Sequence, residues 1–196
     1  KSKKNTIDPE KIIKDYGADS VRLFILSDSP PEKDVQWSEE GIAASFKFVQ
    51  KLWNLNLNIH HAIKKNHKND GSEDLKKFTN KYIKKMEYNL SNFNYNIIIA
   101  NLHEAYSFLI KEVVKPYKKD TLVENYQKIL ITMMPIIPHF ASESLEMLKV
   151  DEQELKWPKF DEKLLQDNWS TIVVQINGKK RGILKLEHNI NEENLY

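Results

Sequence analysis

The feature that most constrains the fold is a series of long amphipathic segments between Ser38 and about residue 148. In the first segment, apolar residues recur at spacings of three and four, which places them on one face of a helix. Three further segments, over about 72–90, 94–115 and 120–136, repeat the pattern. Because the connections between them are short, the sequence predicts an antiparallel helical bundle. The apolar positions of the first segment are Ile42, Phe46, Val49, Leu52, Trp53, Leu57 and Ile63.

Capping residues and prolines predict where the shorter helices begin and end. The run Asp8-Pro9-Glu10 favours a helix start, since aspartate suits the N-cap and proline the first helical position, and Gly17 favours its end. A second short helix over 19–26 is apolar on most sides, so it should be buried at a junction. Pro135 and Pro138 must kink or break the fourth long helix, because neither has a backbone donor. A last short helix is predicted over 139–148.

After about Val150 the pattern changes. A polar linker is followed by TIVVQINGKKRGILKLE, which alternates with period two around Asn177-Gly178, a pair that favours a type I′ hairpin turn. A lone hairpin is marginally stable, so it should begin a small C-terminal α/β domain that this chain does not complete. The predicted fold is therefore mainly α, with these divisions: connecting helices in 1–34, bundle in 35–150, linker in 151–168 and truncated domain start in 169–196.

Composition excludes several classes of protein. The chain has 196 residues, of which 40% are hydrophobic and 30% charged, a balance typical of globular domains. It contains no cysteine, which excludes disulfides, thiolate metal sites and cysteine nucleophiles. No apolar run is long enough to span a bilayer and no signal-peptide pattern occurs at the start, so a soluble, cytoplasmic protein is expected.

Basic residues are locally clustered, although the net charge of +2 does not itself indicate a nucleic-acid binder. A solvated helix face is the plain interpretation of any one cluster. The alternative is contact with RNA phosphates, which position a folded RNA without reading its sequence. The candidates for such contact are a helix stripe of Lys77, Lys81, Lys84 and Lys85 and a hairpin tip of Lys179, Lys180 and Arg181.

Other candidate sites are weaker. His60, His61 and His67 have no acidic or cysteine partner at ligand spacing, so no metal site is predicted. His139 is expected to act as a structural capping residue or to face RNA, rather than to serve as a general base. Four aromatics lie on apolar helix faces and are predicted to belong to the core rather than to stack on bases. They are Phe46, Trp53, Tyr82 and Tyr106.

Three stretches resemble segments of class I aminoacyl-tRNA synthetases and, within that class, of the leucyl-tRNA synthetase family. The first, KSKKNTIDPEKIIKDYGADSVRLFILSDSPPEKDVQWSEEGI, is similar to the segment that follows the family's catalytic Lys-Met-Ser-Lys-Ser loop. The second, MMPIIPHFASE, resembles the Pro-x-x-Pro-His signature of the helical anticodon-binding domain. The third, KWPKFDEKLL followed by the hairpin, resembles the start of the bacterial leucyl enzyme's C-terminal domain.

Aligned in this way, Lys1 and Ser2 are the last two residues of the catalytic loop. The resemblance implies that Lys1 contacts ATP and that Ser2 helps to shape the loop. A lysine suits amino-acid activation, because negative charge builds on the ATP phosphates in the transition state. ATP and Mg²⁺ are expected in the full-length enzyme, and neither is expected to be bound to this fragment.

The resemblance implies the C-terminal, tRNA-binding part of an aminoacyl-tRNA ligase that activates leucine and transfers it to tRNA(Leu). The fragment alone should be inactive because it lacks the catalytic core, and it is expected to be a monomer that binds no membrane. Two alternatives remain open. One is the equivalent region of a valyl-, isoleucyl- or methionyl-tRNA synthetase, and the other is a helical protein-interaction scaffold without an RNA role.

Overall fold

The computed structural model describes residues 7–28, 35–65, 67, 73–150, 155–165 and 169–187. Helix α1 (Pro9–Tyr16) begins where the sequence predicts it, because the Asp8 carboxylate accepts a hydrogen bond from the Glu10 backbone N–H at 3.0 Å. Gly17 then ends the helix at φ 82°, a backbone region that glycine adopts easily. The chain turns at once into α2 (Ala18–Asp28).

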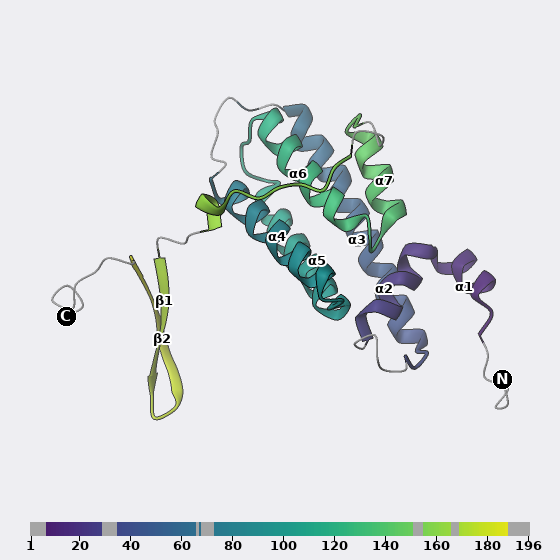
Figure 1. The fold of residues 1–196 in the computed structure, drawn as a ribbon, viewed down its shortest axis with the longest axis horizontal. Helices are drawn as coiled ribbons and strands as arrows, with labels where there is room; N and C mark the ends of the chain where they lie inside the picture. The colour runs from purple at the N-terminus through teal and green to yellow at the C-terminus, as the bar shows by residue number, and fades with distance from the viewer. Residues whose placement is uncertain are drawn as a thin grey trace. The chain divides into compact units, whose positions relative to one another are not determined.

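The predicted helical bundle is confirmed, and it follows α2 in the chain (Figure 1). Helix α3 packs against α5 and α6, α4 packs against the same two helices, and α7 packs against α6 and α3. Their apolar faces form one continuous core, which stabilises helices that would be marginal alone. The bundle helices are α3 (Glu39–Lys65), α4 (Glu73–Ser91), α5 (Tyr95–Glu112), α6 (Lys119–Met133) and α7 (Pro138–Met147).

Helix α2 lies at a junction, as its apolar sequence predicts. It packs against α1, α3, α5 and α7, and its Leu23 and Phe24 side chains are buried. Phe24 forms a small second core with Ile12 of α1 and Ile42 of α3. Gly41 permits this packing, because a Cβ atom there would lie 2.6 Å from the Phe24 ring. The first turn of α3 can therefore approach α2 closely.

Helix α5 ends at Glu112, whereas the sequence predicts that it continues to Lys115. The Glu112 side chain is buried and accepts hydrogen bonds from the Lys115 ammonium, at 2.7 Å, and from the Tyr117 hydroxyl. These bonds hold the following residues in a turn, so the helix stops before Pro116 is reached. Among the described residues, no helix is both long and apolar enough to cross a bilayer.

The described chain divides into two compact units, residues 1–160 and 161–196. The second unit contains a short 3₁₀ helix, η2 (Glu162–Leu165), and an antiparallel hairpin of β1 (Trp169–Ile176) and β2 (Lys179–Glu187). Asn177 and Gly178 have φ values of 53° and 73°, as the predicted type I′ turn requires. A register shift after Val174 leaves Arg181 without a partner residue on β1.

Candidate nucleic-acid interface

The lysine stripe predicted on α4 is present but is largely engaged with other side chains. Lys77 lies 2.6 Å from Glu73, and Lys85 lies 2.8 Å from Glu104 of α5. The Lys84 ammonium lies 5.8 Å from the centre of the Phe160 ring, and Lys81 also has an interaction partner. Hydrogen bonding to Lys77 lowers the pKa of the Glu73 carboxyl. The stripe remains a candidate RNA contact, but neighbouring acids offset much of its charge.

The predicted hairpin tip is well exposed. Lys179, Lys180 and Arg181 follow the turn directly, and all three are exposed within the second unit. Lys1 and Ser2, the predicted end of the catalytic loop, lie outside the described residues. The two basic clusters belong to different units, so each is a separate candidate contact.

Helix α3 carries a basic face that was not among the RNA contacts predicted from the sequence. Lys47, Lys51, Lys64 and Lys65 are all exposed, and none has an acidic partner among the described residues. The signal was available in the sequence, because no Asp or Glu occurs from Gly41 to Asn69. In contrast, α4 contains three acids among its 19 residues.

Two histidines on or beside α3 have a lowered pKa, mainly because of burial and secondarily because of a nearby lysine. Burial lowers the pKa of His60, and the nearby Lys64 lowers it further. Burial likewise lowers the pKa of His103 of α5, and Lys51 adds to the effect. The His103 ring stacks on Phe48 of α3 with 3.8 Å between centroids, which explains its partial burial. Both imidazoles are therefore held toward the neutral form, as expected beside unpaired lysines.

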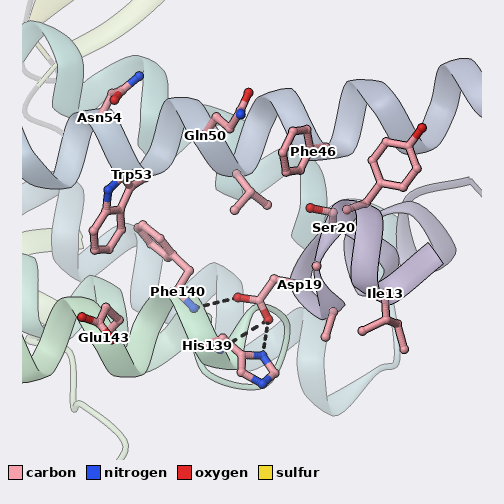
Figure 2. Close-up of a pocket in the computed structure, with 14 residues that line it drawn as sticks. Ile13, Asp19, Ser20, Phe46, Gln50, Trp53, Asn54, His139, Phe140 and Glu143 are labelled. Carbon is pink, nitrogen blue, oxygen red and sulfur yellow. Dashed lines mark hydrogen bonds and ion pairs between the residues drawn. The ribbon is translucent and has the colours of Figure 1, made fainter. Parts of the chain in front are cut away.

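A groove of about 1,070 Å³ runs between α3 on one side and α1, α2 and α7 on the other (Figure 2). The α3 wall combines two partly buried aromatic side chains with two exposed amides. Neither amide forms a hydrogen bond with any of the residues that the structure describes. In order along the helix, these residues are Phe46, Gln50, Trp53 and Asn54.

The opposite wall is fixed by the side chain of Asp19. Its carboxylate accepts hydrogen bonds from the backbone N–H groups of His139, at 3.3 Å, and Phe140, at 2.7 Å, and lies 3.0 Å from Nδ1 of His139 (Figure 2). Asp19 therefore caps the first turn of α7, where free N–H groups and the helix dipole favour an anion. His139, for which the sequence suggested a capping role, is instead one of the residues that Asp19 caps, and its ring adds a second contact to the same carboxylate.

Arg22 lies one turn after Asp19 on α2 and binds the residues that precede α7, where the prolines were predicted to break the helix. Its guanidinium donates to the carbonyl oxygens of Ile136, at 2.8 Å, and Pro135, at 2.6 Å. These carbonyls lie between α6 and α7, where the helical hydrogen-bond ladder is interrupted. Asp19 and Arg22 together supply the donors and acceptors that the break requires. Sequence reasoning predicted the break but not the residues that stabilise it.

The remaining residues considered from the sequence are the aromatics predicted to lie in the core and three histidines. Tyr82 is buried as predicted, and Trp53 and Tyr106 are partly buried and pack against the core. Phe46 is only partly buried, and both Phe46 and Trp53 line the groove. Within the described ranges, no group of three or more histidine or acidic side chains is arranged to hold a metal ion. A helical bundle with one unbalanced basic face and an adjoining amide-lined groove has the features of a nucleic-acid-binding module.

Comparison with known families agrees with this class. Residues 72–196 match the family described as the anticodon-binding domain of tRNA ligase, and residues 1–38 match the class I tRNA synthetases (I, L, M and V). The first match spans more than half of the chain. The chain therefore belongs to the anticodon-binding domain family of tRNA ligases.

Curated relatives share one name. The chain is 37% identical over 205 residues to the leucine–tRNA ligase of Wolbachia pipientis subsp. Culex pipiens (strain wPip), covering 100% of this chain and 24% of that protein. It is 39% identical to that of Wolbachia pipientis wMel, covering 100% and 23%, and 38% identical to that of Orientia tsutsugamushi (strain Boryong), covering 93% and 22%. The chain thus spans about a quarter of the length of these relatives.

A solved structure has the same fold. The LeuRS of Agrobacterium radiobacter K84 agnB2, in a ternary complex with tRNA and LeuAMS, superposes with a TM-score of 0.80. The similarity covers 100% of this chain and 26% of that chain, at 21% sequence identity. At that identity the similarity establishes the fold alone. The fold is the predicted helical bundle followed by a hairpin.

Proposed function

We propose that the chain is the tRNA-binding part of a leucine–tRNA ligase, an enzyme that activates leucine with ATP and transfers it to tRNA(Leu). The observation that carries this proposal is the similarity to leucine–tRNA ligases over the entire chain, at 37% and 39% identity. The valyl, isoleucyl and methionyl alternatives have no comparable support among these relatives. The anticodon-binding family match argues against a scaffold without an RNA role.

The chain's own residues would hold the RNA mainly by charge. Lysines that neutralise phosphates release condensed counterions, so affinity comes largely from this release and falls as salt rises. The lysines of α3 suit this role best because, among the residues that the structure describes, no acid pairs with them and competes with the phosphates. The stripe of Lys77, Lys81, Lys84 and Lys85 and the tip of Lys179, Lys180 and Arg181 are proposed as additional contacts.

Catalysis is proposed to depend on parts of the enzyme beyond this chain. We propose that Lys1 contacts ATP and that Ser2 shapes the same loop. The described residues do not fit Mg²⁺, because they contain no group of three or more histidine or acidic side chains arranged to hold a metal ion. The chain alone is proposed to be an inactive, cytoplasmic monomer. We also propose that the chain is divided into parts that end at residues 34, 150 and 168.

The proposal is tested by titrating a fluorescently labelled tRNA(Leu) transcript with the 196-residue chain at several salt concentrations. Affinity should fall by about 100-fold between 50 and 200 mM salt, the loss expected for about four neutralised phosphates. The chain should also prefer tRNA to heparin at equal charge. Binding that is insensitive to salt, or no tighter than binding to heparin, would contradict a tRNA-binding role.

A further inference from the structure

The groove and its rim differ sharply in charge. The residues that line it include no lysine or arginine, and they include the exposed carboxylate of Glu143. Lys47 and Lys51 lie just outside, on the same helix as the α3 wall. A phosphate would therefore be attracted to the rim and repelled from the interior. An uncharged, flat and polar group would be favoured inside.

The α3 wall offers what a nucleobase requires. The side chains of Gln50 and Asn54 lie one helical turn apart, so both amides project from the same face. Amide side chains pair with the edges of bases, and aromatic rings such as that of Trp53 stack on base faces. In Figure 2, the Trp53 ring projects from α3 toward Phe140, and the side chains of Gln50 and Asn54 project from the other edge of the same helix. Because the two amides make no hydrogen bond with other described residues, they are available to a ligand.

The same helix carries two exposed lysines beside the amides. Lys47 is three residues before Gln50, and Lys51 is three residues before Asn54, so each lysine neighbours one amide on the helix surface. Phosphates can lie on these lysines while the attached base enters the groove. The groove volume of about 1,070 Å³ lies at the top of the usual range for small-molecule sites, roughly 300–1,000 Å³, and exceeds what one nucleoside needs.

Hydrogen bonds within the protein already hold the wall opposite α3 in place. Asp19 is buried and is fully used in capping α7, so it presents no free acceptor to a ligand. The His139 side chain is 74% exposed, and its Nδ1 is held by Asp19. Its other ring nitrogen is thereby left for a ligand on the exposed side. A site whose walls are already fixed loses less entropy on binding.

We propose that this groove holds an unstacked nucleotide of the bound tRNA, with the base inside against Trp53, Gln50 and Asn54 and its flanking phosphates on Lys47 and Lys51. This inference rests on the proposed tRNA-binding function and assigns it a subsite. Glu143 favours bases that carry an exocyclic amino group, because a carboxylate accepts hydrogen bonds from such groups. Charge complementarity selects RNA over a protein segment, since the lysines of the rim have no acidic partner within the described residues.

The test compares two labelled RNAs, a tRNA(Leu) transcript and a fully paired RNA duplex that has no unstacked nucleotide. The double variant Gln50→Ala/Asn54→Ala should bind tRNA about 10-fold more weakly at an unchanged salt slope, because it loses base contacts and keeps phosphate contacts. Its affinity for the duplex should stay within about 2-fold. The variant Lys47→Ala/Lys51→Ala should bind both RNAs more weakly. It should also reduce the slope of log affinity against log salt concentration by about two.

Matched controls separate the groove from the rest of the helix. Asn58→Ala removes an exposed amide of α3 that does not line the groove, and Lys111→Ala removes an exposed lysine of α5. Both should leave tRNA affinity within about 2-fold of the original chain. Since all the substituted side chains are exposed, circular dichroism should show unchanged folding.

A crosslinking experiment identifies the occupant directly. A chain with Gln50→p-benzoylphenylalanine should crosslink to the tRNA on irradiation, and the crosslinked nucleotide should be an unpaired one. If tRNA binds but the amide variant binds it normally, or if the crosslink joins only protein to protein, the groove proposal is overturned while the tRNA-binding function stands. If the original chain does not bind tRNA, both proposals fail.

Discussion

Helices α3 and α4 carry similar numbers of lysines but present different electrostatic surfaces. Helix α3 has four lysines and no acid after Glu40, whereas α4 has five lysines and three acids. On α4, Glu73 lies one turn before Lys77 and neutralises it, and Glu104 of the neighbouring α5 neutralises Lys85. The lysines of α3 have no such partner among the described residues. A cation without a partner contributes more to the field that attracts a polyanion.

The titration behaviour of neighbouring groups reflects this difference. Beside α3, both His60 and His103 have a lowered pKa, because burial and then a lysine disfavour the imidazolium. On α4, a hydrogen bond from Lys77 lowers the pKa of Glu73, and just after α5 a hydrogen bond to Glu112 raises the pKa of Lys115. Burial is the larger cause of the two histidine shifts and the lysines add to it, whereas the shifts of Glu73 and Lys115 come first from their hydrogen-bonded partners. The number of lysines in a helix is therefore a poorer guide to an RNA surface than the acids around them.

The largest expected effect comes from reversing charge on each helix in turn. Lys47→Glu/Lys51→Glu should weaken binding of tRNA(Leu) by about 100-fold at low salt, because two phosphate contacts become repulsive. Lys77→Glu/Lys85→Glu should weaken it by less than about 5-fold, since these lysines are already neutralised. Fluorescence anisotropy at matched salt provides the comparison. Equal losses of tRNA affinity in the two variants would show that the ion pairs on α4 do not affect RNA binding.

A smaller effect is expected when an α4 lysine is released from its partner. Glu104→Gln removes the acid that holds Lys85, so tRNA affinity should rise by about 2- to 3-fold, in keeping with the modest strength of exposed ion pairs. Glu124→Gln is the matched control, because it releases Lys128 from a 2.6 Å pair on α6. The same titration measures both variants. If Glu104→Gln weakens binding, Lys85 does not contribute to the RNA surface.

The smallest effect concerns pH and stability. The folded pKa of His103 lies below its ordinary value of 6.5, so the unfolded chain binds more protons in the window just below pH 6.5. The contribution of the neutral imidazole to the free energy of unfolding is thus complete above that pH, and it is lost as the pH falls through the window. The melting temperature should therefore decrease between pH 7.5 and 5.5, and it should decrease less in His103→Gln. Thermal denaturation followed by circular dichroism tests this, and identical slopes for both proteins would contradict it.

Local signals in the sequence were sufficient for most of the fold. Caps such as Asp8, the three-and-four spacing of apolar residues and the Asn177-Gly178 turn act within a few residues of the structure they specify. Contacts between side chains that are far apart in the sequence could not be predicted from such local signals. Nothing near Glu104 indicates that it meets Lys85, which lies 19 residues away. The groove was missed for the same reason, because Phe46 and Trp53 fit a core pattern and their exposure depends on how α1, α2 and α7 are placed.

The hydrogen bonds of Asp19 and Arg22 have a consequence for the order in which the chain can fold. Their partners lie 113 to 121 residues further along the sequence. During synthesis at about 5–20 residues per second, α2 must wait roughly 6 to 24 seconds before these partners are made. For that interval the apolar side chains of α2 lack part of their final packing surface. Helix α2 therefore forms its long-range hydrogen bonds late, and its apolar side chains keep part of their surface uncovered until the residues around α7 have been made.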